Sequence, residues 1–480
     1  MVEGRTNHIG GEWLADADGA VRTATSPIDG KAIGTIAWSG RGTARQAITV
    51  ARAAQPGWGR TSLWDRAAHL RRAASAIRAQ LEPLAALLTL EQGKPVGEAR
   101  FEVGKAADGF DLAADLIKYL EGRTIPAEDV GKRVMTFWRP RGVYGVITPW
   151  NFPVNIPVEY LAPGLAAGNA IVWTPAPTTA LVAAELVRVI EEADLPPGLL
   201  NLVTGAGPEV GDEIVVNPGT DAVGFTGSAA TGRRIAERAA GKAQLMELGG
   251  NGPVIILADA DLKKAAAATA SGCFVNAGQV CSSSERIIVH AAVHDEFAER
   301  MAAAARAVVL GDPREAGVTM GPLNNPGVAA KVAAHVQDAI ERGAVTIAGG
   351  GPARDRPSAL YFEPTVLLDV SPESLINREE TFGPVAPLLK AASDDEAIAL
   401  ARDNRYGLVA SVCTRDLARA FRFIEEIPAG IVNVNDTSNY WELHIPFGGM
   451  SGKASGTGRI GGLYSLEAMS DLKTATITVD

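Results

Sequence analysis

Four separated stretches of the chain carry residue types that could act together in chemistry. Cys281 ends the run Phe-Val-Asn-Ala-Gly-Gln-Val-Cys, Glu247 precedes Leu-Gly-Gly-Asn, and Asn151 lies between Trp150 and Phe-Pro. Further along, Glu380 precedes Thr-Phe-Gly-Pro. A thiolate is a nucleophile, a carboxylate can accept a proton, and a side-chain amide can donate a hydrogen bond to an oxyanion. A lone cysteine is more often core packing than chemistry, but the four stretches in this order favour a catalytic site.

The constellation resembles the aldehyde dehydrogenase superfamily, in its NAD(P)-dependent hydrolytic type, from near Pro27 to the last residues. The resemblance implies that Cys281 attacks an aldehyde and that hydride leaves the resulting thiohemiacetal. It also implies that the Asn151 side-chain NH2 and the Cys281 backbone N–H hold the oxyanion. Glu247 matches the general base that hydrolyses the thioester, and a carboxylate in an apolar cleft has the raised pKa that suits this role.

Two rival functions stay open at this point. Relatives that pass the acyl group to coenzyme A characteristically lack the glutamate at position 247, so its presence disfavours an acylating semialdehyde dehydrogenase. The chain could also be a structural or binding protein that kept the fold without catalysis. The presence of Cys281, Asn151, Glu247 and Glu380 together disfavours that alternative.

The resemblance places a dinucleotide site on the first α/β domain. Gly227 and Ser228 follow a predicted strand and open a helix whose N-terminal N–H groups could face a pyrophosphate. Glu380 and Phe382 match the positions that hold the nicotinamide ribose and pack on the nicotinamide. The full set implied is Thr148, Pro149, Trp150, Thr174, Pro175, Gly227, Ser228, Leu248, Gly249, Glu380 and Phe382.

Cofactor preference depends on a departure from the family pattern. Thr174 and Pro177 stand where most NAD-using relatives have a lysine and a glutamate that hold the adenosine ribose. Losing the glutamate removes repulsion of a 2′-phosphate, while losing the lysine removes a cation that would attract one. These effects oppose each other, so the sequence leans only slightly to NAD over NADP.

The segment that lines the substrate tunnel in relatives is polar in this chain, with Asn155 and Glu159. We therefore expect a small, polar aldehyde as substrate, unless Glu159 faces solvent. No arginine occupies a matched position that could hold a substrate carboxylate. The expected tunnel residues are Phe152, Asn155, Glu159, Val280, Ser282, Trp441 and His444.

Composition limits the partners of the chain. A formal net charge of -10 over 480 residues argues against nucleic acid or an anionic membrane surface. The start of the sequence lacks an apolar signal region, and three cysteines form neither a disulfide framework nor a zinc spacing. We expect a cytoplasmic enzyme that needs no metal and takes a small-molecule aldehyde, and the resemblance implies a homodimer or homotetramer.

Short β-branched runs alternate with helical segments, which indicates βαβ units and mostly parallel sheets. The predicted strands are 143–148, 170–173, 199–203, 221–225, 254–257, 286–289, 345–347, 365–367, 409–412 and 431–434. The predicted fold is α/β, with two Rossmann-like domains and a small β-flap for oligomerisation. We expect residues 1–123 and 141–248 to form the dinucleotide-binding domain and 249–451 to form the catalytic thiol domain. Residues 124–140 and 467–480 are expected to form the flap.

Overall fold

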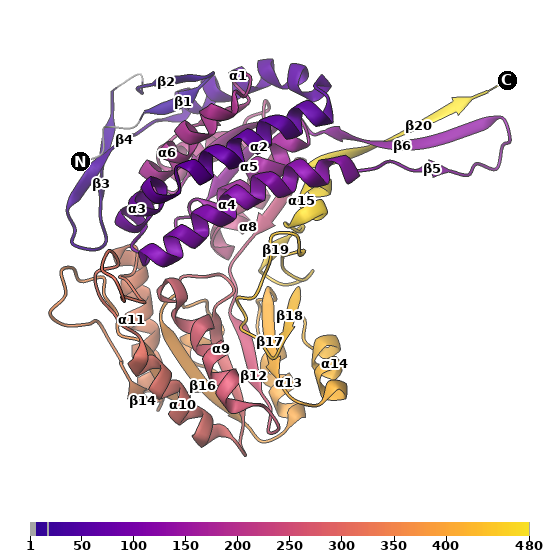
Figure 1. Ribbon diagram of the computed structural model, residues 1–480. Helices are drawn as coiled ribbons and strands as arrows, with labels where there is room; N and C mark the ends of the chain where they lie inside the picture. Colours follow the sequence, from indigo (N-terminus) through magenta and orange to yellow (C-terminus); the bar gives the residue numbers. More distant parts are fainter. Residues whose placement is uncertain (1–5, 17–18, 480) are drawn as a thin grey trace.

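The computed structural model describes residues 6–16 and 19–479 of the chain (Figure 1). The predicted domain ends at residues 1–5 and 480, together with residues 17 and 18, lie outside the described part. Two lobes, each built on a mostly parallel sheet with helices on both faces, lie one above the other, and a slender arm projects from the upper lobe. The predicted α/β fold with two Rossmann-like units and a β-flap is confirmed.

The upper lobe contains an eight-stranded sheet in the order β19-β11-β10-β7-β8-β9-β1-β2. Strands β7 to β11 run parallel, and antiparallel strands close both edges. The strands are β1 (Asn7–Ile9), β2 (Glu12–Leu14), β7 (Val143–Thr148), β8 (Ala170–Pro175), β9 (Leu200–Leu202), β10 (Ala222–Thr226), β11 (Ala243–Glu247) and β19 (Gly456–Thr457). The β3 (Val21–Thr25) and β4 (Ala32–Ala37) strands form a separate hairpin.

Long Ala- and Leu-rich helices cover this sheet, as the helical spacing of apolar residues predicts. They are α1 (Arg41–Arg60), α2 (Leu63–Ala79), α3 (Leu81–Gln92), α4 (Val96–Leu116), α5 (Asn155–Ala166), α6 (Ala180–Ile190), α7 (Asp212–Val216), α8 (Ala229–Arg238) and α15 (Gly462–Ala468). Short turns add η1 (Ile117–Tyr119), η2 (Pro177–Thr179), η3 (Glu191–Ala193) and η4 (Gly207–Gly211). No described helix is long and apolar enough to cross a membrane.

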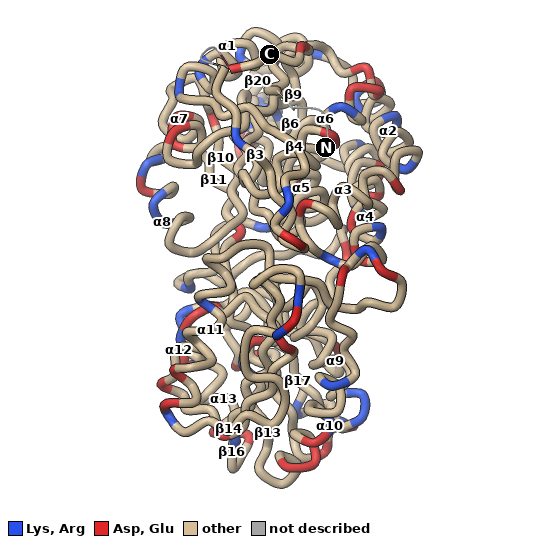
Figure 2. The backbone as a smooth tube through the Cα atoms, turned by 90° about the vertical axis from the view of Figure 1, so that its left-hand side faces the viewer, with Lys and Arg blue, Asp and Glu red and all other residues tan. Residues whose placement is uncertain are grey.

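The lower lobe contains a seven-stranded sheet in the order β14-β15-β16-β13-β12-β17-β18. Its strands are β12 (Gly252–Ile256), β13 (Ser284–His290), β14 (Val345–Ala348), β15 (Thr365–Leu368), β16 (Val385–Ala391), β17 (Val409–Cys413) and β18 (Ile431–Val434). Its helices are α9 (Leu262–Phe274), α10 (His294–Ala307), α11 (Pro326–Glu341), α12 (Leu375–Arg378), α13 (Asp394–Arg402) and α14 (Leu417–Glu426). Charged residues gather on the outer helices, while the inner strands are mostly uncharged (Figure 2).

The pattern of β-branched runs misses strand β16, although it lies between β15 and β13 inside the sheet. Pro387 interrupts this strand and pairs with Leu367. Because proline lacks an N–H and is rare in central strands, its presence argues against a strand from sequence alone. The other residues of β16 pair with the parallel strands β15 and β13, and this pairing maintains the strand.

The projecting arm is a three-stranded sheet in the order β20-β6-β5. It comprises β5 (Thr124–Ile125), β6 (Lys132–Pro140) and β20 (Ser470–Thr478). Strand β20 pairs antiparallel with all of β6, from Ser470 opposite Pro140 to Thr478 opposite Lys132. Both lie away from the two lobes, with the end of the chain near the tip (Figure 1).

Candidate active site

A cavity of about 410 Å³ is lined by residues of both lobes. Cys281 and Glu247 both line it, although 34 positions separate them in sequence. Six of the seven expected tunnel residues also line it: Phe152, Asn155, Glu159, Val280, Ser282 and Trp441. His444 does not; its side chain is 61 % exposed and lies 3.5 Å from that of Glu442.

Cys281 follows the turn η5 (Val275–Gly278), in which Asn276 and Ala277 both adopt left-handed backbone conformations. Such conformations are unfavourable for non-glycine residues and persist only where surrounding contacts enforce them. Burial, and then the nearby carboxylates of Glu380 and Glu247, raise the pKa of the Cys281 thiol. The thiol therefore rests protonated, and its proton must move to a base as it attacks.

The other two cysteines are core residues. Cys273 and Cys413 are each 1 % exposed, and the Cys273 thiol donates to the Ser284 carbonyl. Burial raises the pKa of Cys413 to about 12. Neither lines the cavity that contains Cys281.

Asn151 is fixed beside the loop of the nucleophile. Its side-chain Nδ2 donates to the Gln279 carbonyl at 3.0 Å, two residues before Cys281. Its backbone carbonyl accepts from Lys94 Nζ at 2.8 Å and from Asn276 Nδ2 at 3.0 Å. The amide is 3 % exposed and is held by these contacts, but Asn151 does not line the cavity, so its role as donor to a developing oxyanion stays a prediction.

The sequence did not indicate the buried ion pair that supports this arrangement. Lys94 Nζ lies 2.5 Å from Glu102 Oε2, and both side chains are almost fully buried. Glu102 Oε1 also accepts from the Val154 N–H at 2.8 Å. The pair thus ties α4 to the segment containing Asn151. Lys94 and Glu102 are eight positions apart with Glu98 and Arg100 between them, so no local pattern in the sequence singles out this pair.

Glu247 ends strand β11 and is 3 % exposed. Neither of its carboxylate oxygens accepts a hydrogen bond of good geometry among the described residues, although the Ile460 N–H and the Arg459 charge lie close enough to favour its ionised form slightly. Burial, and then the charge of Glu159, raise the pKa of Glu247 well above the usual range. A destabilised carboxylate in a cavity with a thiol is suited to accept a proton.

Glu159 lines the same cavity from α5, so the side chain does not simply face bulk solvent. Its Oε1 accepts from Asn155 Nδ2 at 2.6 Å, which is one turn earlier on the helix. Burial raises the pKa of Glu159 to about 8. The two polar residues singled out in the tunnel segment therefore act as one hydrogen-bonded unit.

The residues expected to bind the dinucleotide lie at the carboxyl ends of parallel strands, where open α/β sheets bind ligands. Thr148 and Pro175 are paired at the ends of β7 and β8, with Thr174 buried next to them. Gly227 and Ser228 connect β10 to α8, and the exposed Ser228 caps the helix by accepting from the Thr231 N–H. The N-terminus of α8 fits an anionic pyrophosphate.

Glu380 lies against the glycine pair that follows Leu248. A Cβ at Gly249 would lie 2.6 Å from Glu380 Oε1, and the Gly250 N–H donates to the same oxygen at 3.1 Å. A Cβ at Gly250 would collide with the Cys281 carbonyl. Glycine at both positions thus lets the nucleophile loop and this carboxylate approach each other.

Phe382 has a left-handed backbone with φ of 61°, and its ring meets that of Trp150 edge to face at 5.6 Å. Glu285 holds this strained turn, because its carboxylate accepts from the N–H groups of Thr381 and Phe382. The sequence did not indicate this role of Glu285. Together with Glu380 and the α8 N-terminus, these residues offer groups of the kind that a nicotinamide dinucleotide needs, namely N–H donors for a pyrophosphate and a carboxylate and an aromatic ring for the nicotinamide half.

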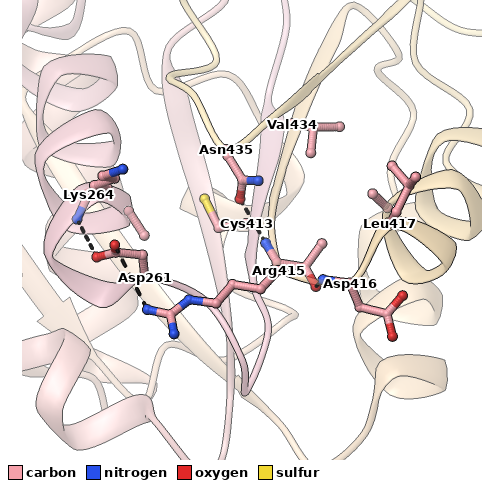
Figure 3. Close-up of a pocket in the computed structure, with 11 residues that line it drawn as sticks. Asp261, Lys264, Cys413, Arg415, Asp416, Leu417, Val434 and Asn435 are labelled. Atoms are coloured by element: carbon pink, nitrogen blue, oxygen red, sulfur yellow. Dashed lines mark hydrogen bonds and ion pairs between the residues drawn. The ribbon is translucent and has the colours of Figure 1, made fainter.

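A second hollow, of about 400 Å³, lies at the carboxyl ends of β17 and β18 (Figure 3). Asp261 and Asp416 border it, and each uses its carboxylate to cap the helix that it precedes. Asp261 also lies 3.9 Å from Arg415. Cys413 borders the hollow but is buried in its floor. The two carboxylates of this hollow are thus partnered by the protein itself.

Comparison with known proteins agrees with the geometry. The model of the aldehyde dehydrogenase family matches residues 13–475. The chain is 39 % identical to a glutarate-semialdehyde dehydrogenase of Pseudomonas putida, over 98 % of this chain and 97 % of that protein. It is also 39 % identical to the NADP(+) succinate-semialdehyde dehydrogenase GabD of Escherichia coli, over 97 % of this chain and 96 % of that one.

Solved structures have the same architecture. The crystal structure of an E. coli NADP-dependent enzyme superposes with a TM-score of 0.97 at 38 % identity, covering 99 % of this chain and 98 % of that one. An NAD-dependent aldehyde dehydrogenase from Sinorhizobium meliloti has a TM-score of 0.96 at 35 % identity, covering 99 % and 95 %. Relatives named for both cofactors occur, so the cofactor is NAD or NADP and the lean to NAD is not supported. The coenzyme A-acylating and non-catalytic alternatives are not favoured, and the chain belongs to the aldehyde dehydrogenase family as an NAD(P)-dependent enzyme that oxidises aldehydes to acids.

Proposed function

We propose that this enzyme oxidises a small, polar aldehyde through a covalent intermediate on Cys281, with Asn151 as oxyanion donor and Glu247 as general base. One observation carries the proposal: the only cysteine that lines the cavity, among the described residues, shares it with a buried carboxylate that accepts no hydrogen bond of good geometry. A carboxylate in this state would not be expected at a purely structural site, because burial of a carboxylate without a partner lowers the stability of the folded protein.

The residues divide the reaction into steps. The Cys281 sulfur bonds to the aldehyde carbon while its proton passes to solvent, which leaves the Glu247 carboxylate in the same cavity ionised for the later step. Asn151 stabilises the resulting oxyanion, which re-forms a carbonyl as the C–H bond breaks. A bound nicotinamide supplies the acceptor for the hydride. Glu247 then takes a proton from water, whose oxygen bonds to the acyl carbon as the C–S bond breaks, and the acid leaves.

The cofactor would lie on residues 1–123 and 141–248, and 249–451 would supply the thiol. We propose that Ser228 and the α8 N-terminus face the pyrophosphate and that Glu380 and Phe382 contact the nicotinamide half. The family relation supports a cytoplasmic homodimer or homotetramer. The arm supports self-association as well, because it exposes Met135, Leu472 and Ile477 by 40 %, 55 % and 44 % outside the two lobes.

The test is formation of reduced nicotinamide by wild type and by Cys281→Ser and Glu247→Gln variants, with each cofactor and with neutral, cationic and anionic aldehydes. We expect loss of all turnover in the Cys281→Ser variant, and in the Glu247→Gln variant a rapid first turnover followed by slow release. Undiminished turnover in either variant would overturn the proposed roles.

A further inference from the structure

The cavity around Cys281 has an unusual charge balance. Five carboxyl groups contribute to its lining: Glu98, Glu102, Glu159, Glu247 and Glu442. Among the described residues, its lining contains no arginine and one cation, Lys105. The Lys105 ammonium is 40 % exposed and lies 3.8 Å from Asp108 on the outer side of α4. Lys105 therefore lies at the rim of the cavity and is already paired with Asp108.

The carboxyl groups differ in whether the protein already balances them. Glu102 is paired with Lys94, and Glu98 accepts from the Asn276 N–H and also feels the Lys94 charge. Glu442 accepts from the Tyr440 hydroxyl at the rim. Glu247 belongs to the reaction. Glu159 has one amide partner, Asn155, and no ion pair among the described residues. Glu159 is thus the wall carboxyl that is free to receive a ligand.

We infer that the enzyme is built for an aldehyde that carries a protonated amine, with Glu159 as the carboxylate that receives the ammonium group. This inference rests on the proposed function and names its substrate class. Aromatic rings of Trp441 and Phe447 complete the wall, and ring faces attract cations, whereas the ring of Phe152 already carries the Lys94 ammonium at 3.9 Å from its centroid. A carboxylate on the substrate would instead enter beside Glu159 with no arginine to balance it, which is strongly unfavourable in a dry cavity.

Three aldehydes with the same propylene spacer test the inference: γ-(dimethylamino)butyraldehyde, isoheptanal and glutarate semialdehyde, which end in a cation, a neutral isopropyl group and an anion. The tertiary amine cannot close to a cyclic imine. We expect kcat/KM for the cation to exceed that for isoheptanal by about tenfold or more, which corresponds to about 1.4 kcal/mol of charge pairing, and the anion to be the poorest.

The variant Glu159→Gln should lower kcat/KM for the cation by about tenfold while changing that for isoheptanal by less than about threefold. Glu442→Gln is the matched control, because Glu442 is half exposed at the rim and its charge is screened by water. An equal loss for all three aldehydes, or a preference of wild type for glutarate semialdehyde, would overturn the inference.

A binding measurement separates this inference from the proposed function, because it needs no turnover. Calorimetry of the holoenzyme with γ-(dimethylamino)butanol, an analogue that keeps the protonated amine and has a neutral alcohol in place of the aldehyde, is run near neutral pH in two buffers of different ionisation enthalpy. Since burial raises the pKa of Glu159 to about 8, receiving an ammonium should release a proton from it. Binding that weakens by about tenfold in the Glu159→Gln variant, together with loss of any proton release, supports the inference even for an enzyme without aldehyde turnover; equal affinity of wild type and variant, or no binding, overturns it.

Discussion

The cavity around Cys281, between the two lobes, and the hollow beside Cys413, in the lower lobe, have nearly the same size, about 410 Å³ and about 400 Å³, but different chemistry. In the first, Glu247 accepts no hydrogen bond of good geometry among the described residues. In the second, Asp261 and Asp416 cap helices (Figure 3). A buried polar group left without a partner costs free energy, so it persists where function requires it. The catalytic cavity is therefore distinguished by a buried carboxylate without a well-formed hydrogen bond, and not by its volume.

Replacing the two cysteines should give the largest contrast. Cys281→Ala removes the nucleophile, so we expect turnover to fall by at least about a thousandfold. Cys413→Ala should leave kcat/KM within about twofold and lower the free energy of unfolding by about 1 kcal/mol, because it only removes a buried sulfur. Steady-state assays and urea denaturation measure the two effects. Turnover in Cys281→Ala above a tenth of wild type would break the contrast.

The ion pairs of the two regions should differ in their contribution to stability. Lys94→Met leaves the buried Glu102 carboxylate without its cation, and we expect a loss of about 3–5 kcal/mol in the free energy of unfolding. Arg415→Met removes an exposed partner 3.9 Å from Asp261 and should cost less than about 1 kcal/mol. Urea titrations of both variants give the comparison, and equal losses would contradict it.

Substitution of one carboxylate in each hollow should have the next largest difference in effect on turnover. Glu247→Gln cannot accept a proton, so we expect steady-state turnover to fall by about a hundredfold while the first turnover still releases reduced nicotinamide in a burst. Asp416→Asn keeps a capping side chain at α14 and should leave turnover unchanged. Stopped-flow absorbance resolves the burst. Loss of the burst together with turnover in Glu247→Gln would instead place Glu247 in thiol activation.

The smallest expected effect is a difference between Glu159 and Asp259 in how their contributions to stability depend on pH. Burial raises the pKa of Glu159 to about 8, so its contribution to stability is full below the unfolded pKa of about 4.3 and is lost as pH rises towards 8. For Asp259, burial is outweighed by hydrogen bonds from Thr414 and Arg415 and by Arg419, which lower its pKa. Its contribution is lost as pH falls below about 4.

Denaturation of wild type, Glu159→Gln and Asp259→Asn at about pH 5 and about pH 8 tests these signs. Between those values the stability advantage of wild type over Glu159→Gln should shrink by about 1–3 kcal/mol, while the advantage over Asp259→Asn stays nearly constant. An advantage over Glu159→Gln that grows with pH would mean that Glu159 is ionised in the folded enzyme.

The sequence predicts the parts of this enzyme that depend on local pattern or on a motif. The strands at 143–148 and 431–434 follow from β-branched runs, and the motifs around Cys281 and Glu247 predict that these residues share a cavity. Lys94 and Glu102 were missed because their significance depends on a tertiary contact that no local pattern reports. His444 is adjacent in sequence to cavity residues, but its side chain points away from the cavity. The precise roles of the matched residues stay predictions until the variants are measured.

Strand β20 has a consequence for synthesis of the chain. It pairs with residues 132–140, which leave the ribosome more than three hundred residues before it, and β19 covers the edge of the strand that ends in Glu247. Both contacts need the last portion of the polypeptide, while N-terminal segments emerge first during translation. The nascent chain therefore keeps the long edge of β6 and the edge of β11 unpaired until translation ends. A stop codon before position 456 would release a protein with both edges open and prone to mispairing.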